Sequence, residues 1–298
     1  MADPLLTSAL LRQLEQFQLL ARRRAKSSLR GERRSRARGQ SVEFADYRSY
    51  VPGDDFRALD WNLYGRLDRL FLKLYEEERE LPVTILLDAS ESMTFGEPRK
   101  FDAALRIAAA VGYVGLCGFD RVTVRAFPEN PAQAALRGAL RSVRGRKSTL
   151  AFLRNLSQLS AGGQADFNAA LIRGALETRH AGLAVILSDF LEPAGYEPGL
   201  KALLGRGFQV SAVQILSPEE LSPGTFGDLR LVDSETGAEQ EVTFGKYRLK
   251  IYQQTVENYC QRLREFCQKR GVHFFRTRTD DSLEQLLLRQ LREAEIWG

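Results

Sequence analysis

The feature that most constrains the fold is an alternation between short aliphatic runs and longer helix-forming stretches, which starts at residue 81. Continuous runs of Val, Ile and Leu are typical of strands that are buried on both faces of a sheet. Strands that alternate with helices favour a mostly parallel sheet with helices on both faces. We therefore predict an α/β domain. The expected strands are residues 81–90, 121–127, 183–190, 209–216 and 272–279, and the expected helices are residues 100–117, 148–159, 167–178, 198–206 and 247–270.

Both ends of the chain predict further helices. Asp3 can cap the first helix, and Pro4 suits its first turn. Ser282 can cap a last helix that reaches to about residue 294. The apolar stripe of the first helix follows helical spacing and consists of Leu10, Leu14, Phe17 and Ala21.

Two segments predict β-structure outside the main alternation. Residues 69–79 alternate like a strand, and residues 229–244 form two alternating runs about a turn, which predicts a hairpin. We expect these parts to form one small β-rich appendage. The predicted organisation is an N-terminal helix and basic linker at residues 1–31, the appendage at residues 32–80 with 228–245, and the α/β domain at residues 81–298.

The positive charge of the chain is concentrated in one stretch. The net charge is +5, and nine basic residues stand against one acid, Glu32, between Arg22 and Arg38. Such a stretch can contact phosphates or an acidic partner, which leaves nucleic-acid binding open as a function. No aromatic residue interrupts it, so base stacking is missing, and a solvated basic linker is the alternative.

Several classes of protein are disfavoured. No apolar run is long enough to span a bilayer, and the N-terminus lacks the basic segment of a secretory signal, so we expect a cytoplasmic protein. Cys260 and Cys267 lie seven residues apart, which favours buried thiols over a metal site. His180 and His273 stand alone, with no visible catalytic triad.

Oxygen-bearing side chains follow two of the predicted strands. Asp88, Ser90 and Ser92 alternate after the first strand, and Asp189 follows the third. Ligands of open α/β sheets bind at the carboxyl ends of the strands. A set of oxygen ligands suits Mg²⁺, although Asp and Ser after a strand also commonly form turns and cap helices.

The segments DASES (88–92), GGQADFNAAL (162–171) and LSDF (187–190) together resemble a von Willebrand factor A domain, whose sheet is Rossmann-like. The resemblance implies a metal-ion-dependent adhesion site. Asp88, Ser90 and Ser92 match its first loop and Asp189 its third, and Mg²⁺ is the implied cofactor. In the second loop, Ala165 stands where a Thr is expected. Either Asp166 or a water replaces that ligand, or the site is degenerate and shapes a protein-binding surface.

The segment EFADYRSYVPGDDFRALDW (43–61) resembles the bacterial family named domain of unknown function 58, and the likeness extends over nearly the whole chain. The segment carries five acids and two arginines. We interpret them as ion pairs and hydrogen bonds that hold an irregular segment in place. A catalytic carboxylate cluster is the alternative, but the segment contains no His or Lys as a second titrating partner.

These observations favour a non-enzymatic protein-interaction module. The family resemblance implies a partner, a MoxR-type AAA+ ATPase, for which the chain would serve as an adaptor. The chain has no GxxxxGK[ST] motif, so ATP hydrolysis would come from that partner. The alternatives are an Mg²⁺-dependent phosphohydrolase that uses Asp88 and Asp189, and a nucleic-acid-binding protein that uses residues 22–38.

Overall fold

The computed structural model describes residues 4–17, 19, 42–77, 80–223, 227–232, 239–282, 284 and 286–287. The chain divides into two compact units. Unit 1 consists of Met1–Ala21 and Leu81–Gly298, and unit 2 consists of Arg22–Glu80. The basic stretch at residues 22–38 and most of the helix expected after Ser282 lie outside the described residues.

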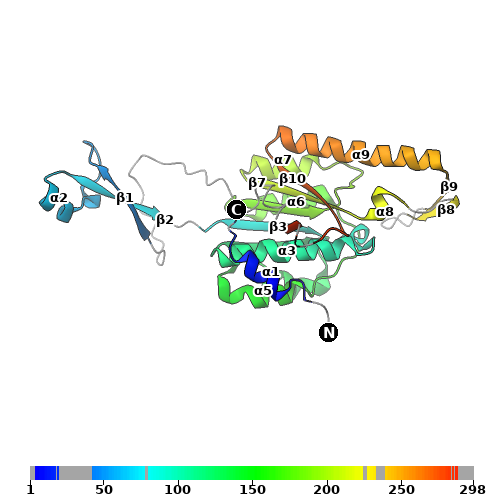
Figure 1. Cartoon of the computed structure of the whole chain (residues 1–298), viewed down its shortest axis with the longest axis horizontal. Helices are drawn as coiled ribbons and strands as arrows, with labels where there is room; N and C mark the ends of the chain where they lie inside the picture. The colour runs from blue at the N-terminus through cyan, green and yellow to red at the C-terminus, as the bar shows by residue number, and fades with distance from the viewer. Residues whose placement is uncertain are drawn as a thin grey trace. The chain divides into compact units, whose positions relative to one another are not determined.

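A six-stranded sheet forms the centre of unit 1 (Figure 1). All neighbouring strands are parallel except β5, which pairs antiparallel with β4. The predicted mostly parallel α/β sheet is therefore confirmed. In spatial order the strands are β10 (His273–Arg278), β7 (Gln209–Leu216), β6 (Leu183–Ser188), β3 (Pro82–Asp88), β4 (Arg121–Phe127) and β5 (Val143–Arg144).

Helices cover both faces of this sheet (Figure 1), as expected. On one face lie α1 (Ser8–Leu14), α3 (Lys100–Cys117) and α5 (Thr149–Leu156), which pack over the first core. On the other face lie α6 (Phe167–Glu177), α7 (Glu197–Gly205) and α9 (Lys246–Lys269), which pack over the second core. The described part of unit 1 also contains the short helices α4 (Ala134–Ala139) and α8 (Pro218–Leu221), and the 3-10 turns Glu91–Thr94, Pro131–Gln133 and Arg146–Ser148.

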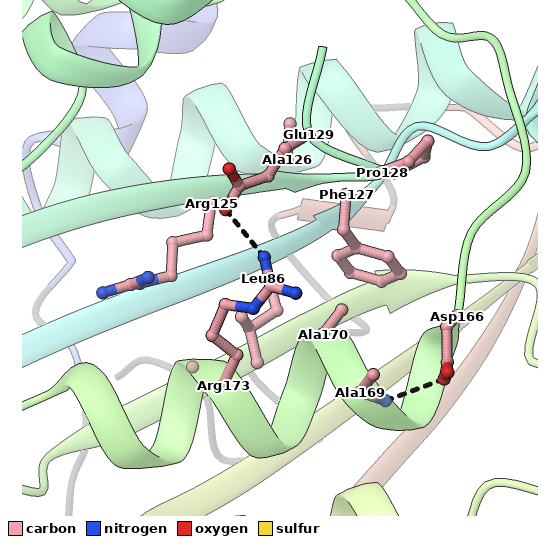
Figure 2. Close-up of a pocket in the computed structure, with 11 residues that line it drawn as sticks. Leu86, Arg125, Ala126, Phe127, Pro128, Glu129, Asp166, Ala169, Ala170 and Arg173 are labelled. Atoms are coloured by element: carbon pink, nitrogen blue, oxygen red, sulfur yellow. Dashed lines mark hydrogen bonds and ion pairs between the residues drawn. The ribbon is translucent and has the colours of Figure 1, made fainter. Parts of the chain in front are cut away.

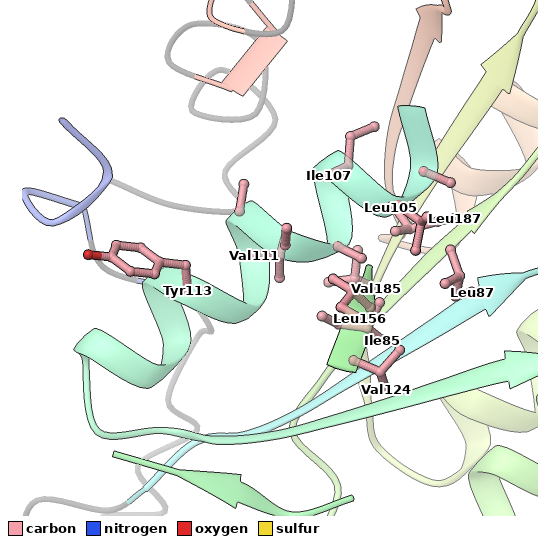
Figure 3. Close-up of a cluster of buried hydrophobic side chains, with 14 of the residues drawn as sticks. Ile85, Leu87, Leu105, Ile107, Val111, Tyr113, Val124, Leu156, Val185 and Leu187 are labelled. Carbon is pink, nitrogen blue, oxygen red and sulfur yellow. The ribbon is translucent and has the colours of Figure 1, made fainter. Parts of the chain in front are cut away.

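The strands belong to both cores because successive side chains point to opposite faces. In β3, Ile85 and Leu87 join the first core, whereas Leu86 joins the second. Figure 3 shows Ile85 and Leu87 beneath α3, close to Val185 and Leu187 of the neighbouring strand β6. This double burial explains why the strand has a continuous aliphatic sequence.

The N-terminal helix begins later than predicted. Its N-cap is Thr7, whose hydroxyl accepts a hydrogen bond from the Leu10 amide at 3.3 Å. The expected cap Asp3 is outside the described residues, as is Ala21, and Phe17 follows the end of the helix. Leu10 and Leu14 are buried in the first core and Phe17 packs against it, so the predicted stripe is confirmed at these three positions.

Unit 2 contains an antiparallel pair and a short helix. Strand β1 (Val42–Ser49) pairs with β2 (Phe71–Glu77), and a β-bulge interrupts the register between Phe44 and Asp46. Helix α2 (Trp61–Leu67), which the sequence pattern did not predict, lies between these strands in the sequence. A single 3-10 turn, Phe56–Ala58, precedes it.

The predicted second hairpin exists, but it does not join β1 and β2. Strands β8 (Gly227–Val232) and β9 (Glu239–Phe244) form their own two-stranded sheet and belong to unit 1. We expected residues 32–80 and 228–245 to make one appendage. Alternating polarity identifies a strand, but it does not say which other strand completes the hydrogen bonds.

Two smaller expectations can be compared with the structure. Cys260 and Cys267 are both buried free thiols, as predicted. Among the described residues, we find no helix that combines the length and the apolar character needed to cross a membrane.

Candidate functional site

The candidate site lies where β3 and β6 end side by side. The chain runs from β3 to β4 on one side of β3 and later returns to place β6 on the other side. Such a reversal opens a crevice at the carboxyl ends of the two strands. The β3–β6 register ends with Leu87 level with Leu187, and Asp88 and Ser188 follow as the last residues of the two strands. The loops after these strands supply the polar residues of the site.

Asp88 is buried and accepts three hydrogen bonds. The Ser90 amide and hydroxyl donate to its Oδ1 at 3.0 and 2.7 Å, and the Ser188 hydroxyl donates to its Oδ2 at 2.6 Å. Burial, together with the nearby charge of Asp189, raises the pKa of Asp88 to about 7, although the three hydrogen bonds oppose the shift. The three hydrogen bonds hold the Asp88 side chain in one position and connect the ends of β3 and β6.

A hydroxyl chain links the first loop to the third. The Ser90 and Ser92 hydroxyls lie 3.0 Å apart, and the Ser92 hydroxyl donates to Asp189 Oδ2 at 3.3 Å. Four of the five predicted site residues, Asp88, Ser90, Ser92 and Asp189, are thus brought into one hydrogen-bonded network. We call residues 90–95 and 189–191 the strand-end rim, in which Phe95 and Leu191 are the exposed side chains.

The third loop is held in an unusual backbone conformation. Phe190 has φ 58°, in the left-handed region that few large residues adopt. Its amide donates to the Ser188 hydroxyl at 3.0 Å, and its carbonyl accepts from the Tyr259 hydroxyl of α9 at 2.7 Å. The Asp189 Oδ1 atom also accepts from the Leu191 amide at 3.0 Å. These bonds fix the Asp189 carboxylate in place before any partner binds.

A buried lysine neutralises this carboxylate. Lys100 opens α3 and is 1% exposed, and its ammonium donates to Asp189 Oδ2 at 2.6 Å and to Glu220 of α8. Burial alone lowers the pKa of Lys100, but the carboxylates of Asp189 and Glu220 raise it by more, and the net pKa is above its usual range. The lysine is therefore a permanent cation inside the site.

The second partner of Lys100 belongs to a well-ordered turn. Ser217 and Glu220 form a capping box at α8, with the Ser217 amide donating to Glu220 Oε2 at 2.9 Å. The Glu220 carbonyl accepts from the Tyr252 hydroxyl of α9 at 2.8 Å. Lys100 consequently connects α3, the third loop, α8 and, through Glu220, α9.

The second loop does not extend this network. Ala165 packs against the second core, and Asp166 is exposed and caps α6 by accepting from the Ala169 amide at 2.8 Å. We expected Asp166 to substitute for the missing Thr, but its carboxylate already caps α6. Figure 2 shows Asp166 at the end of a separate hollow of about 160 Å³.

That hollow is charged and lies at the end of β4. Arg173 pairs with Glu129 across it at 3.3 Å, and Phe127 lines its apolar side (Figure 2). Asp88 and Asp189 are not among its lining residues. A phosphohydrolase would need these two carboxylates to face a substrate cavity, and this hollow does not provide that arrangement.

The surface beside the buried network is partly apolar. Phe95 is 49% exposed, and its ring centroid lies 6.0 Å from the Lys100 ammonium, within the range of a cation–π contact. Leu191 follows the Asp189 loop and is 40% exposed. Ser92 is half-buried between the charged interior and the surface. A partner that binds the strand-end rim would therefore contact exposed apolar side chains, with the buried polar network directly beneath them.

In unit 2, the acidic segment has a structural role. Asp60 accepts from the Asn62 and Leu63 amides at 2.9 and 3.2 Å and caps α2. Asp54 accepts from the Val51 amide and from Arg48, each at 2.9 Å, and both contacts lower its pKa. These carboxylates serve as caps and ion-pair partners, which supports the structural interpretation of residues 43–61.

The rim does not fit a divalent cation well. Among the described residues there is no group of three His, Cys, Asp or Glu side chains placed to hold a metal. A dication sharing Asp189 Oδ2 with Lys100 would lie within about 5 Å of the ammonium and be repelled by roughly 7 kcal/mol at an effective dielectric constant of about 20. Ala165 adds no oxygen. The donor set that the resemblance implies is therefore incomplete and already holds a positive charge.

Sequence reasoning missed Lys100 and Glu220. Acidic residues usually occupy the first turn of a helix, because the helix dipole favours negative charge there. A lysine that opens a helix as apolar as residues 101–116 is an anomaly that could have drawn attention to Lys100. Glu220 lies in a separate turn with no pattern that connects it to the strand ends.

The chain is similar to proteins of one family. A family model described as "Protein of unknown function DUF58" matches residues 46–260. An uncharacterized protein of Mycobacterium tuberculosis (strain ATCC 25618 / H37Rv) is 32% identical over 242 residues, which cover 80% of this chain and 74% of that protein. An uncharacterized protein of Mycobacterium avium is 40% identical over 65 residues, or 22% of this chain and 38% of that protein.

Two solved structures show more distant likeness. A conserved hypothetical protein, BatB, from Bacteroides thetaiotaomicron has a TM-score of 0.41 and 14% identity, covering 72% of this chain and 98% of that one. An aerotolerance-related membrane protein from Bacteroides fragilis has a TM-score of 0.38 and 16% identity, with the same coverage. Likeness of this degree carries no conclusion about function.

Proposed function

The chain belongs to the DUF58 family, and we propose that it is a non-enzymatic protein-interaction module that docks a partner on the strand-end rim. The observation that carries this proposal is the convergence of Asp88, Ser92 and Asp189 in one hydrogen-bonded network. The network lies at the carboxyl ends of the central strands β3 and β6. The network is preorganised before binding, which reduces the entropic cost of association.

The chemistry of the rim supports recognition over catalysis. Both carboxylates are occupied: Asp88 accepts from three donors, and Asp189 is paired with Lys100. A general base must reach a substrate proton, and these two groups are 5% exposed. The half-exposed Phe95 and Leu191 beside them are the kind of apolar groups that centre protein interfaces.

We further propose that unit 1 is a von Willebrand A-like domain and that the partner is a MoxR-type AAA+ ATPase. The support for this partner is the family resemblance, together with the lack of a phosphate-binding GxxxxGK[ST] loop in the chain itself. In this assignment the chain selects or presents a client, and the ATPase supplies the energy of hydrolysis.

Docking can be tested with a purified MoxR-type ATPase from the same organism. Phe95→Ser and Leu191→Ser remove the exposed apolar groups of the rim without altering a buried side chain. We expect each to weaken binding roughly tenfold or more in biolayer interferometry, since interface anchors cost about 1–3 kcal/mol when truncated.

Matched controls lie elsewhere on unit 1. Phe119 and Leu150 are 68% and 75% exposed, and Phe119→Ser and Leu150→Ser make the same chemical changes away from the rim. These controls should bind like the wild type. Equal affinity for the rim variants and the controls, or no binding by the wild-type chain, would refute docking of this ATPase on the rim.

A further inference from the structure

We propose that the Lys100 ammonium permanently takes the role that a divalent cation has in an adhesion-type site, so that the strand-end rim works without metal. This inference rests on the proposed function only in its choice of site. Its test needs no partner protein, so either proposal can fail alone.

The Lys100 ammonium lies directly against the third loop. Lys100 Nζ lies 2.6 Å from Asp189 Oδ2, and the Ser92 hydroxyl donates to the same oxygen at 3.3 Å. A cation held by the first and third loops would draw on the Asp189 carboxylate and the Ser92 hydroxyl. The lysine thus already neutralises the carboxylate that a metal would neutralise.

The ammonium is enclosed and cannot easily leave this position. It is 1% exposed, and its other ion-pair partner, Glu220, has a side chain that is only 13% exposed. The Phe95 ring lies over it at 6.0 Å. If Lys100 moved out to admit a metal, Glu220 would remain as a buried carboxylate with its ion pair broken, which is a costly arrangement.

The two hydroxyls of the first loop already donate hydrogen bonds to carboxylates. The Ser90 hydroxyl donates to Asp88 at 2.7 Å, and the Ser92 hydroxyl donates to Asp189. At position 165, alanine stands where the resemblance to a von Willebrand factor A domain implies a threonine ligand. The absence of a threonine and the presence of Lys100 both disfavour metal binding. Substitutions at positions 165 and 100 test the two effects separately.

The test is isothermal titration of the full chain with MnCl₂ and MgCl₂. For the wild type we expect no binding below millimolar concentrations. Lys100→Met, and the double variant Lys100→Met/Glu220→Gln that also removes the orphaned carboxylate, should gain Mn²⁺ affinity by roughly tenfold or more. This gain should disappear when Asp189→Asn is added. Lys201→Met, at an exposed position of α7, is the control and should behave like the wild type.

Ala165→Thr separates the two explanations. Alone, it should leave the wild type unable to bind metal, and in the Lys100→Met background it should tighten Mn²⁺ binding further. The proposal is overturned if the wild type binds Mn²⁺ at micromolar concentration through Asp189, or if Ala165→Thr alone creates such a site. It is also overturned if folded Lys100→Met and the folded double variant bind no more metal than the wild type.

Discussion

The environment of Asp88 makes the stability of the folded chain depend on pH. Burial and the charge of Asp189 raise its pKa to about 7 in the folded chain, against an ordinary value of 3.8. Between these two pH values the folded state therefore binds more protons than the unfolded state. Stability must fall as the pH rises through this window, and the loss is complete above about pH 7.

The first prediction follows from this linkage. In urea unfolding, the wild type should lose about 2–4 kcal/mol of stability between about pH 5 and pH 8, whereas Asp88→Asn, which cannot ionise, should lose much less over that range. Asp102→Asn removes an exposed carboxylate of α3 and should keep the wild-type slope. Parallel curves for wild type and Asp88→Asn would show that Asp88 is not the group responsible.

Single residues also mark the limit of sequence reasoning about the site. Asp88, Ser90, Ser92 and Asp189 could be predicted because each follows directly from the end of a recognisable strand. Lys100 could not, because its partners are distant in sequence, Asp189 after β6 and Glu220 in α8. Long-range pairing of this kind depends on the assembled fold.

At the scale of elements, the approach of β6 to β3 depends on a glycine. A Cβ atom on Gly182, which directly precedes β6, would lie 2.1 Å from the Pro82 carbonyl oxygen. Backbone atoms cannot move away without disturbing the start of the β3–β6 ladder, where Val83 is level with Leu183. The spacing of these two strands sets the distance across which the Ser90 and Ser92 hydroxyls connect Asp88 with Asp189.

The second prediction is therefore that Gly182→Ala destabilises unit 1 by roughly 1–3 kcal/mol through overpacking. Gly138→Ala is the control, since a Cβ there meets nothing within 4 Å and lies in α4, where alanine is the better helix former. Chemical denaturation monitored by circular dichroism measures both. A Gly182→Ala protein as stable as Gly138→Ala would contradict the packing described.

Elements differ in how well the sequence predicted them. The strands β3, β4, β6, β7 and β10 carry aliphatic or alternating runs, and the structure contains all of them. Helix α2 was missed because its seven residues, WNLYGRL, contain a glycine and bury no residue, so no apolar stripe announces it. The start of α2 is set by the Asp60 cap. In a sequence, an Asp that caps a helix looks the same as an Asp that begins a turn.

At the scale of the whole molecule, unit 1 is built from two separate parts of the chain. The N-terminal helix α1 inserts Leu10 and Leu14, which are 1% and 0% exposed, into the first core beside α3. The Tyr113 hydroxyl of α3 donates to Glu15 at 2.8 Å. Unit 2 follows residue 21 and ends before Leu81, where unit 1 resumes.

The third prediction concerns this division. Leu14→Ala should destabilise unit 1 by about 2–5 kcal/mol, because it opens a cavity in a packed core. The Asn62 and Leu63 amides of unit 2, which Asp60 caps, should keep their protection in hydrogen exchange. Leu150→Ala, on the exposed side of α5, is the control and should change neither unit.

If hydrogen exchange instead showed that Leu14→Ala exposes both units together, the chain would unfold as one cooperative body. The sequence predicted the α/β domain and the N-terminal apolar stripe separately, but not that the stripe completes the core of that domain. Periodicity identifies a buried face, and only the fold shows what covers it.

A lysine, and not a metal, neutralises the strand-end rim. Anomalous diffraction at the manganese edge, from crystals of the wild-type chain soaked in MnCl₂, tests it most directly. We predict Lys100 Nζ within hydrogen-bonding distance of Asp189 and Glu220, and no anomalous peak among Ser90, Ser92 and Asp189. A strong peak at that position, with the Lys100 side chain displaced from Asp189, would contradict the claim.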